Sequence, residues 1–340
     1  MTPADLSRCV VRAVRCAVED GELPAAVVVP ERVVVERTRP GGVGDYASPV
    51  AFQVAKGAKG VGGAGFPPRG VADVLARRLG AEPGIESVEV TGAGFLNFVL
   101  PAVSAPDVVR DVASRDLRVA AALLAEGEGD AGGLRETVVR RCVLRLLRVQ
   151  GGHARELPGD FFVAPLAKRD SDVVDRYGAD AAVWGMVVVP ARETPRFDDR
   201  LLVQGEANEF FRVRYAYARS RALSRNAEQI GFRAEAEAEA GDVDGAGDAG
   251  DSAGAAALVR ALADFPLALE AAAHHRAPER LARYLVEPAD ALLDFQHRVL
   301  PKGDEKPSAA HRARLALAEA AGTVLAGGLA LLGMDASERL

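Results

Sequence analysis

The stretch NEFFRVRYAYARSRALSR, residues 208–225, combines arginine and aromatic side chains more densely than any other part of this chain. Apolar residues recur within it every three or four positions, which predicts one long helix over residues 201–229. At about 100° per residue the arginines form two stripes along that helix. The first stripe comprises Arg214, Arg221 and Arg225, and the second comprises Arg212 and Arg219.

Two interpretations of this helix are open. Guanidinium groups bind phosphate oxygens and aromatic rings stack on unpaired bases, so the helix has the side chains needed to bind single-stranded loop RNA. Alternatively, the arginines are solvated and the aromatic rings, including Tyr215 and Tyr217, belong to the core. The residues of the helix, considered by themselves, favour the second interpretation.

Residues on either side of this helix extend the helical pattern. From residue 170 onward, periodic apolar positions predict an all-α antiparallel bundle with further helices over 258–273, 278–299 and 309–332. Residues 234–256 interrupt the bundle with seven acidic side chains and no basic one. Because this segment has almost no large apolar residues, we expect a flexible insert. An acidic arm that mimics nucleic acid is the alternative.

The N-terminal part of the chain has a different pattern. The sequence predicts an α+β module, with helices packed on one face of a small, mainly antiparallel sheet. Expected helices cover residues 4–19, a segment capped by Asp45 that carries Val50, and residues 71–79. Expected strands cover residues 26–29, 32–36, 85–91 and 94–100. The glycine-rich run 60–65 fits the letters of GxGxxG, but an expected helix precedes it where a nucleotide-binding turn needs a strand.

Composition excludes several classes of protein. The 340 residues are 49% hydrophobic and 26% charged with a net charge of −6, as in a soluble protein of two domains. The longest apolar run, residues 320–334, is shorter than the roughly 18–20 residues of a membrane span, and the N-terminus lacks a signal peptide. Three cysteines, an odd number, predict free thiols, and the lack of CxxC, HxxH and HxH spacings predicts no metal site. A cytoplasmic location is expected, and the preference for arginine over lysine indicates a GC-rich bacterial genome.

Several separate motifs, in order, resemble those of arginyl-tRNA synthetases. Residues 44–51 (GDYASPVA) and 88–98 (VEVTGAGFLNF) resemble the two signatures of that family's N-terminal additional domain. Residues 177–181 (YGADA) resemble its GAD segment, and residues 208–219 resemble the NPxxYVQYAHAR stretch that opens its DALR anticodon-binding bundle. The C-terminal part of the chain also resembles this family, at LARYL (281–285), Phe295, LLGM (331–334) and ERL (338–340). The resemblance implies domains over 1–115 and 170–340, joined by a connector or catalytic remnant over 116–169.

The resemblance also implies which residues contact tRNA. In the family the additional domain binds the elbow of tRNA and the DALR bundle binds the anticodon stem-loop. By motif, the elbow side would hold Asp45, Tyr46, Phe95 and Asn97. The anticodon side would hold Arg212, Arg214, Tyr215, Tyr217 and Arg219, with Arg221 and Arg225 further along the helix. Ser48-Pro49 replaces Thr-Asn, Arg214 replaces Gln, Tyr217 replaces His and Leu340 replaces Met, which puts specificity for one anticodon in doubt.

The family's catalytic motif is missing from the sequence. No two histidines lie three residues apart, so HxGH is absent, and the roughly 60 residues between the two resembling regions are too few for several βα units of about 30 residues each. We therefore expect a non-catalytic protein that binds a tRNA, with an arginine isoacceptor as the expected partner, and that needs no ATP or other cofactor. One alternative is a protein-interaction module that acts on a full-length synthetase or a tRNA-dependent enzyme. A functional arginine-tRNA ligase is the other.

Overall fold

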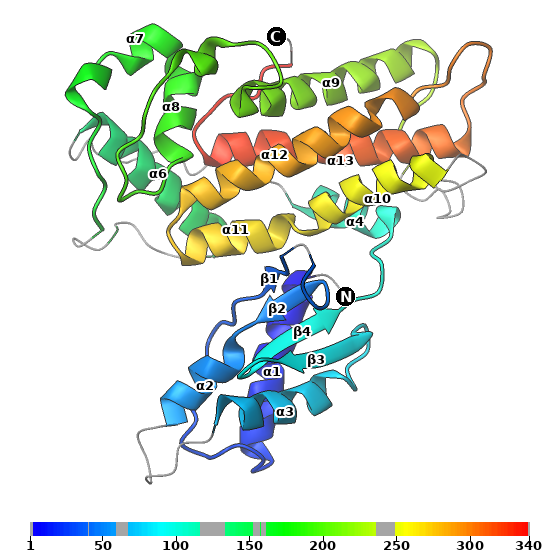
Figure 1. Cartoon of the computed structure of the whole chain (residues 1–340). Coiled ribbons are helices and arrows are strands. Elements are labelled where there is room, and N and C mark those ends of the chain that lie inside the picture. Colours follow the sequence, from blue (N-terminus) through cyan, green and yellow to red (C-terminus); the bar gives the residue numbers. More distant parts are fainter. Residues whose placement is uncertain are drawn as a thin grey trace. The chain divides into compact units, whose positions relative to one another are not determined.

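The chain forms two compact units, Met1–Val103 and Ser104–Leu340, in the computed structural model (Figure 1). The structure describes residues 3–39, 41–58, 67–115, 133–151, 157, 161–235 and 249–338. The glycine-rich run 60–65 and most of the predicted acidic insert lie outside these ranges.

The first unit contains a small antiparallel sheet with three helices. The helices are α1 (Pro3–Glu19), α2 (Val50–Ala58) and α3 (Pro68–Leu79). The strands are β1 (Glu36–Arg37), β2 (Tyr46–Ser48), β3 (Ser87–Thr91) and β4 (Phe95–Val99), and their order in the sheet is β1-β2-β4-β3. Helix α3 packs on β3 and β4, and α2 packs on β4. The predicted α+β module with a hairpin at residues 85–100 is confirmed.

Two predictions for this unit were wrong. Of the predicted strands 26–29 and 32–36, only Glu36 pairs with another strand. The Ser7 hydroxyl donates to the Val33 carbonyl at 2.7 Å and the Ser48 hydroxyl donates to the Val34 carbonyl at 2.8 Å, so side chains satisfy this segment in place of a sheet ladder. Asp45 does not cap a helix, because β2 lies between it and α2.

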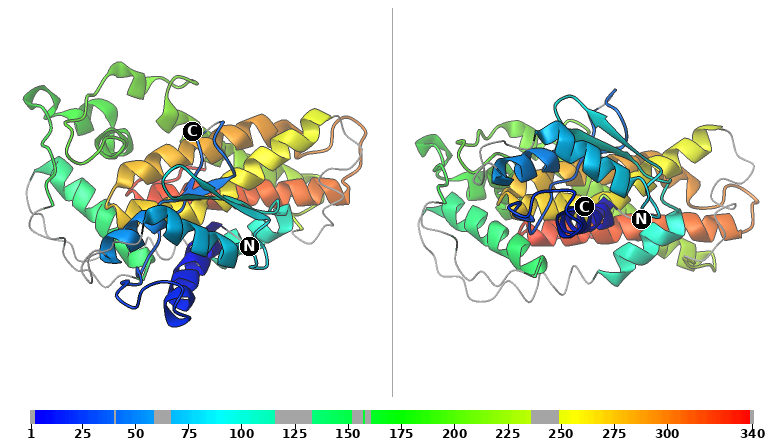
Figure 2. Two further views of the ribbon diagram at one scale, coloured as in Figure 1. Left: turned by 60° about the horizontal axis from the view of Figure 1, so that its bottom comes forward. Right: turned by 90° about the horizontal axis from the view of Figure 1, so that it is seen from below.

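The second unit is a helical bundle. Its helices, listed with their bounds, are α4 (Ala105–Ser114), α6 (Leu134–Val149), α7 (Val173–Tyr177), α8 (Ala179–Val187), α9 (Glu209–Gln229), α10 (Ala249–Ala263), α11 (Phe265–His274), α12 (Pro278–Phe295) and α13 (Ala309–Leu331). Helices α9, α12 and α13 pack on one another, and α12 and α13 run alongside each other (Figure 2). Glycines make this close approach possible: a Cβ atom on Gly328 of α13 would lie 2.4 Å from Leu285 Cδ2 of α12.

Several predicted boundaries in the bundle differ from the structure. The long helix begins at Glu209, because Asn208 caps it by accepting a hydrogen bond from the Phe211 amide at 3.2 Å. The predicted helix 258–273 is two helices that meet at Asp264, and residues 249–256 of the predicted insert belong to α10. Helix α4 packs on α13, so the division between the units falls after Val103 and not at residue 115.

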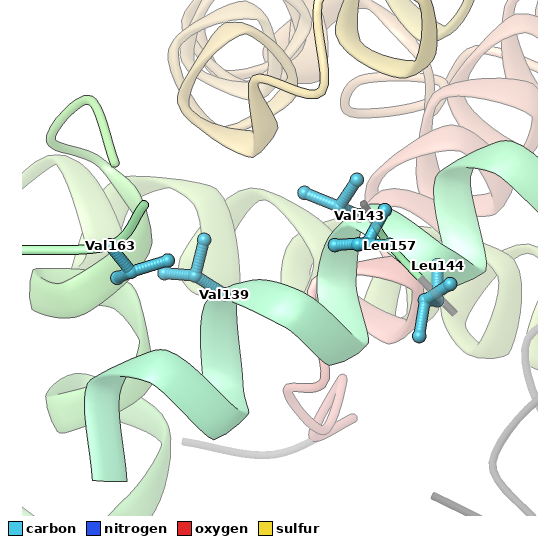
Figure 3. Close-up of a cluster of buried hydrophobic side chains, with 5 residues drawn as sticks. All are labelled: Val139, Val143, Leu144, Leu157 and Val163. Carbon is cyan, nitrogen blue, oxygen red and sulfur yellow. The ribbon is translucent and has the colours of Figure 1, made fainter. Parts of the chain in front are cut away.

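Helix α6 lies in the segment 116–169, which was predicted as a connector or catalytic remnant. Buried apolar residues of α6 pack against Leu157 and Val163, as Figure 3 shows, where Val163 lies beside Val139 and Leu157 beside Val143. The Arg135 side chain of α6 is only 1% exposed and donates to five backbone carbonyls, those of Ala164, Met186, Val189, Pro190 and Ala191. The α6 segment is thus an integral part of the bundle.

One helix among the described residues is long and apolar enough to cross a membrane. It is α13, and 78% of its most apolar window is buried inside the bundle. Core helices of globular proteins meet the same length and composition criteria, so this helix is weak support for a membrane span.

Candidate nucleic-acid interface

Helix α9 carries all seven residues that were predicted to lie on the anticodon side. It runs for 21 residues and places a continuous row of apolar residues against α12 and α13. The remaining side chains are divided between contacts with neighbouring helices and exposure to solvent. These two groups differ in what they can bind.

Two of the predicted arginines are engaged within the bundle. Arg212 forms a bidentate ion pair with Asp290 of α12, with Nε–Oδ1 and Nη2–Oδ2 distances of 2.8 and 3.2 Å, and also donates to the Glu206 carbonyl. Arg219 donates from Nε to Gln296 Oε1 at 2.7 Å. The stripe that they share therefore faces α12 and the turn after it, and it contributes to helix packing.

Two arginines of the other stripe form ion pairs with a single carboxylate. Glu338 accepts from Arg221 Nε at 3.1 Å and from Arg225 Nη1 at 3.4 Å. All three side chains remain between 36% and 47% exposed, so water screens both ion pairs. These two arginines are accessible to a phosphate group that displaces Glu338.

The third member of that stripe, Arg214, lies within an aromatic cluster. Its guanidinium carbon is 5.4 Å from the centroid of the Phe210 ring, and its Nε is buried without a hydrogen-bond partner. On the neighbouring surface the Phe211 and Tyr215 rings stack with centroids 5.6 Å apart and an angle of 11° between their planes. Tyr215 is 38% exposed. We call Phe211, Arg214 and Tyr215 the α9 platform.

Tyr217 does not reach the surface, which corrects its predicted place on the anticodon side. Its side chain is 1% exposed and lies in the core next to α13. The physical reason is helix periodicity, because residues 215 and 217 are separated by about 200° around the axis. Phe211 was not among the predicted contact residues, although its spacing of four from Tyr215 indicates that the two share a face.

In the first unit the four predicted elbow residues also separate into buried and exposed groups. Tyr46 is 6% exposed and contacts the Arg37 guanidinium at 5.5 Å from the ring centroid. Asp45 binds its own unit, because its Oδ2 accepts from the Leu100 amide at 3.1 Å. Both residues hold the end of β4 against β2, so their observed contacts are structural.

Phe95 and Asn97 lie on the opposite face of the sheet from Tyr46. Both line a hollow of about 420 Å³ together with Thr91, Arg37 and Arg39, none of which was predicted. Phe95 is 45% exposed, whereas Asn97 is 7% exposed and donates to the Thr91 hydroxyl at 2.7 Å. Cross-strand register is the signal that finds Thr91, since it pairs directly with Phe95. We call this feature the sheet hollow.

The described residues contain no group of three or more His, Cys, Asp or Glu side chains placed to hold a metal ion. Cys9, Cys16 and Cys142 are free thiols. The α9 platform and the sheet hollow present aromatic rings, guanidinium groups and hydrogen-bonding side chains.

Two family models match the chain and correspond to its two units. Residues 8–100 match the arginyl tRNA synthetase N terminal domain, and residues 213–340 match the DALR anticodon binding domain. The arginine–tRNA ligase of Frankia alni is 49% identical over 112 residues, which is 33% of this chain and 19% of that protein. The chain is thus related to arginyl-tRNA synthetases and carries both domains that its motifs predict.

A solved structure shows the same fold. The arginyl-tRNA synthetase of Thermus thermophilus superposes with a TM-score of 0.56 and 15% sequence identity, over 100% of this chain and 100% of that one. At this identity the match supports the arrangement of elements and carries no information about activity.

Proposed function

We propose that this relative of the arginyl-tRNA synthetases binds a tRNA, through the α9 platform and the sheet hollow, and does not charge it. The bound RNA is a tRNA of the arginine class, and the setting is the bacterial cytoplasm. The observation that carries the proposal is the Phe211–Tyr215 stack, which reaches the surface through Tyr215, on the helix that also carries Arg214 and with which the DALR match begins.

The α9 platform has the features of a surface that binds unpaired bases. Two parallel rings extend a flat apolar surface on which a base can stack, and every base has such a face. Arg214 of the same helix supplies a guanidinium group, which lies over the Phe210 ring, and Arg221 and Arg225 follow along the same stripe. Anticodon loops present unpaired bases next to closely spaced phosphates, which matches this combination.

The sheet hollow offers the same combination on a smaller scale. Phe95 provides an exposed ring, packed at 4.9 Å between centroids against Phe52, and Arg39 provides a cation at the edge. The Asn97 amide is held in place by its hydrogen bond to Thr91, so the direction of its carbonyl oxygen is fixed. These groups suit a loop with a displaced base, as at the elbow of tRNA.

The absence of charging activity is part of the proposal and is supported by the sequence. In the family, the imidazoles of HxGH stabilise the charge that develops on the ATP phosphates in the transition state. This motif does not occur in the chain. The strands among the described residues are those of the first unit, and all of them pair antiparallel. A parallel nucleotide-binding sheet is therefore not among the described elements.

Retardation of tRNA by the purified chain, measured across a series of salt concentrations, tests this function. Phe211→Ala combined with Tyr215→Ala should weaken binding by at least tenfold, because base stacking contributes about 1–3 kcal/mol per base. Ile230→Ala is the matched control, since Ile230 is 51% exposed just beyond α9. Arg214→Ala should lower the log–log salt slope by about one unit, because one phosphate contact is lost.

The outcomes separate the proposal from its rivals. Absence of tRNA retardation at low salt would exclude the binding function. Co-purification with a synthetase or a tRNA-dependent enzyme that ribonuclease does not affect would favour a protein-interaction module. Exchange of pyrophosphate into ATP in the presence of arginine would show a functional ligase.

A further inference from the structure

The second unit contains a cavity that the α9 platform does not use. Its volume is about 480 Å³, and it lies between three segments: residues 161–162, the loop 190–193 that follows α8, and the connection from α11 to α12. None of these segments was predicted as a site from the sequence. The cavity is large enough to hold a molecule of the size of a mononucleotide.

The walls of this cavity are fixed by two arginines that lie behind them. Arg135 donates to the carbonyls of Pro190 and Ala191, at 3.0 and 3.2 Å, and so holds the loop after α8. Arg140 donates to the Phe161 carbonyl at 2.9 Å, and its guanidinium lies 5.7 Å from the Phe161 ring centroid. A cavity with fixed walls loses little entropy when a ligand binds.

Arg276 lines the cavity in a backbone conformation that arginine rarely adopts. Its φ is +51°, and it is the one non-glycine residue with positive φ in the part of the chain that the structure describes. It follows the C-terminus of α11, a position where helices usually have glycine. An L side chain at this position is strained, and such strain is typical of functional sites. The guanidinium group is the feature that a glycine would not provide.

The other lining residues include a second cation, an aromatic ring and a hydrogen-bond acceptor, together with the exposed Glu193 carboxylate and His275. Arg192 is exposed at the edge of the cavity, and Phe162 is 58% exposed. Glu279, in the first turn of α12, has a carboxylate oxygen, Oε2, that is buried without a hydrogen-bond partner. Burial raises the pKa of the Glu279 carboxyl group, while the charges of Arg283, Arg280 and Arg135 lower it in part.

We propose that this cavity binds a single nucleotide unit. Its base lies against Phe162 and donates an amino N–H to the carboxyl group of Glu279. Its phosphate binds between the guanidinium groups of Arg192 and Arg276. The nucleotide is either a free nucleoside monophosphate or an unpaired residue of a bound RNA, since both present the same base and phosphate.

Equilibrium dialysis of the full chain against GMP, AMP and ribose 5-phosphate tests the proposal, together with tRNA retardation. For a free nucleotide, GMP or AMP should bind saturably and ribose 5-phosphate at least tenfold more weakly. For a nucleotide within RNA, the free compounds should not bind, but Arg276→Gly should weaken tRNA binding by at least fivefold. Glycine accepts the positive φ, so this variant should keep the wild-type melting temperature or exceed it.

Arg196→Gly is the matched control, because Arg196 is an exposed arginine of the same unit outside this cavity. The proposal is overturned if Arg276→Gly changes neither nucleotide nor tRNA binding, or if ribose 5-phosphate binds as well as GMP. Its failure is distinct from failure of the proposed function. A chain that binds tRNA equally well with and without Arg276, and that binds neither GMP nor AMP, refutes only the cavity, and a chain that binds GMP but no tRNA refutes only the proposed function.

Discussion

The α9 platform and the sheet hollow are built from different elements but divide their motif residues in the same way. In each region one tyrosine of the motif is buried, Tyr217 at 1% and Tyr46 at 6% exposure, while a neighbouring ring is exposed, Tyr215 at 38% and Phe95 at 45%. The regions differ in how their arginines are engaged. In α9, Arg212 and Arg219 are held by Asp290 of α12 and by Gln296 directly after it. A family motif thus combines residues that support the fold with residues that are free to bind.

Replacing the buried tyrosines is expected to have the largest effect, which is a loss of stability. Tyr217→Ala and Tyr46→Ala should each lower the free energy of unfolding of their own unit by about 3–5 kcal/mol, as for other large aromatic residues truncated in a core. Tyr215→Ala should change it by less than about 1 kcal/mol, because that ring is partly exposed. Urea unfolding followed by circular dichroism measures all three. A Tyr217→Ala variant as stable as the wild type would show that the burial argument is wrong.

Replacing the exposed rings is expected to have the next largest effect, which is a loss of tRNA affinity. Tyr215→Ala and Phe95→Ala should each reduce tRNA affinity by about 1–3 kcal/mol through lost stacking, with little change in melting temperature. Filter binding at constant salt measures the loss. Equal losses would show that both regions contact the same tRNA, whereas a loss confined to Tyr215→Ala would restrict the interface to the bundle.

The Arg212–Asp290 pair tests whether the arginine supports the fold or binds RNA. With side chains 22% and 47% exposed, the pair should contribute about 0.5–1 kcal/mol to stability. A double-mutant cycle with Arg212→Ala and Asp290→Ala measures this coupling. Arg212→Ala should also lower the salt slope of tRNA binding less than Arg214→Ala does. A larger change in salt slope for Arg212→Ala than for Arg214→Ala would show that Arg212 contacts the RNA.

The Glu338 contacts give the smallest effect. Glu338→Gln should raise tRNA affinity by up to about threefold at low salt, because it frees Arg221 and Arg225 from a screened surface pair worth less than about 1 kcal/mol. Glu228→Gln is the control, since Glu228 is exposed near the end of the same helix. The gain should vanish at high salt. Unchanged affinity would show that neither arginine contacts the RNA.

The sequence predicted the type of most elements, and where it failed the cause was a contact distant along the chain. Apolar periodicity found α1, α9, α12 and α13, and the hairpin of β3 and β4, because each follows from local pattern. Residues 32–35 have the composition of a strand, but hydroxyl groups of Ser7 and Ser48 bind their carbonyls. Such side-chain partners leave no signal in the local sequence.

The same limit applies to the candidate sites. Motif resemblance located α9 and β4, and helix spacing could have added Phe211 to Tyr215. It could not show that Asp290 engages Arg212, because these residues are 78 positions apart. The cavity around Arg276 is assembled from three distant segments, so no single stretch of sequence indicates it.

The central claim is that this chain binds tRNA without activating arginine, and one paired measurement tests it most directly. A single preparation of the full chain should be assayed for tRNA binding at low salt and for arginine-dependent ATP–pyrophosphate exchange with tRNA present. We predict saturable binding that falls with salt along a linear log–log slope, and no exchange above the protein-free rate. Exchange above that rate, or no binding at low salt, would contradict the account.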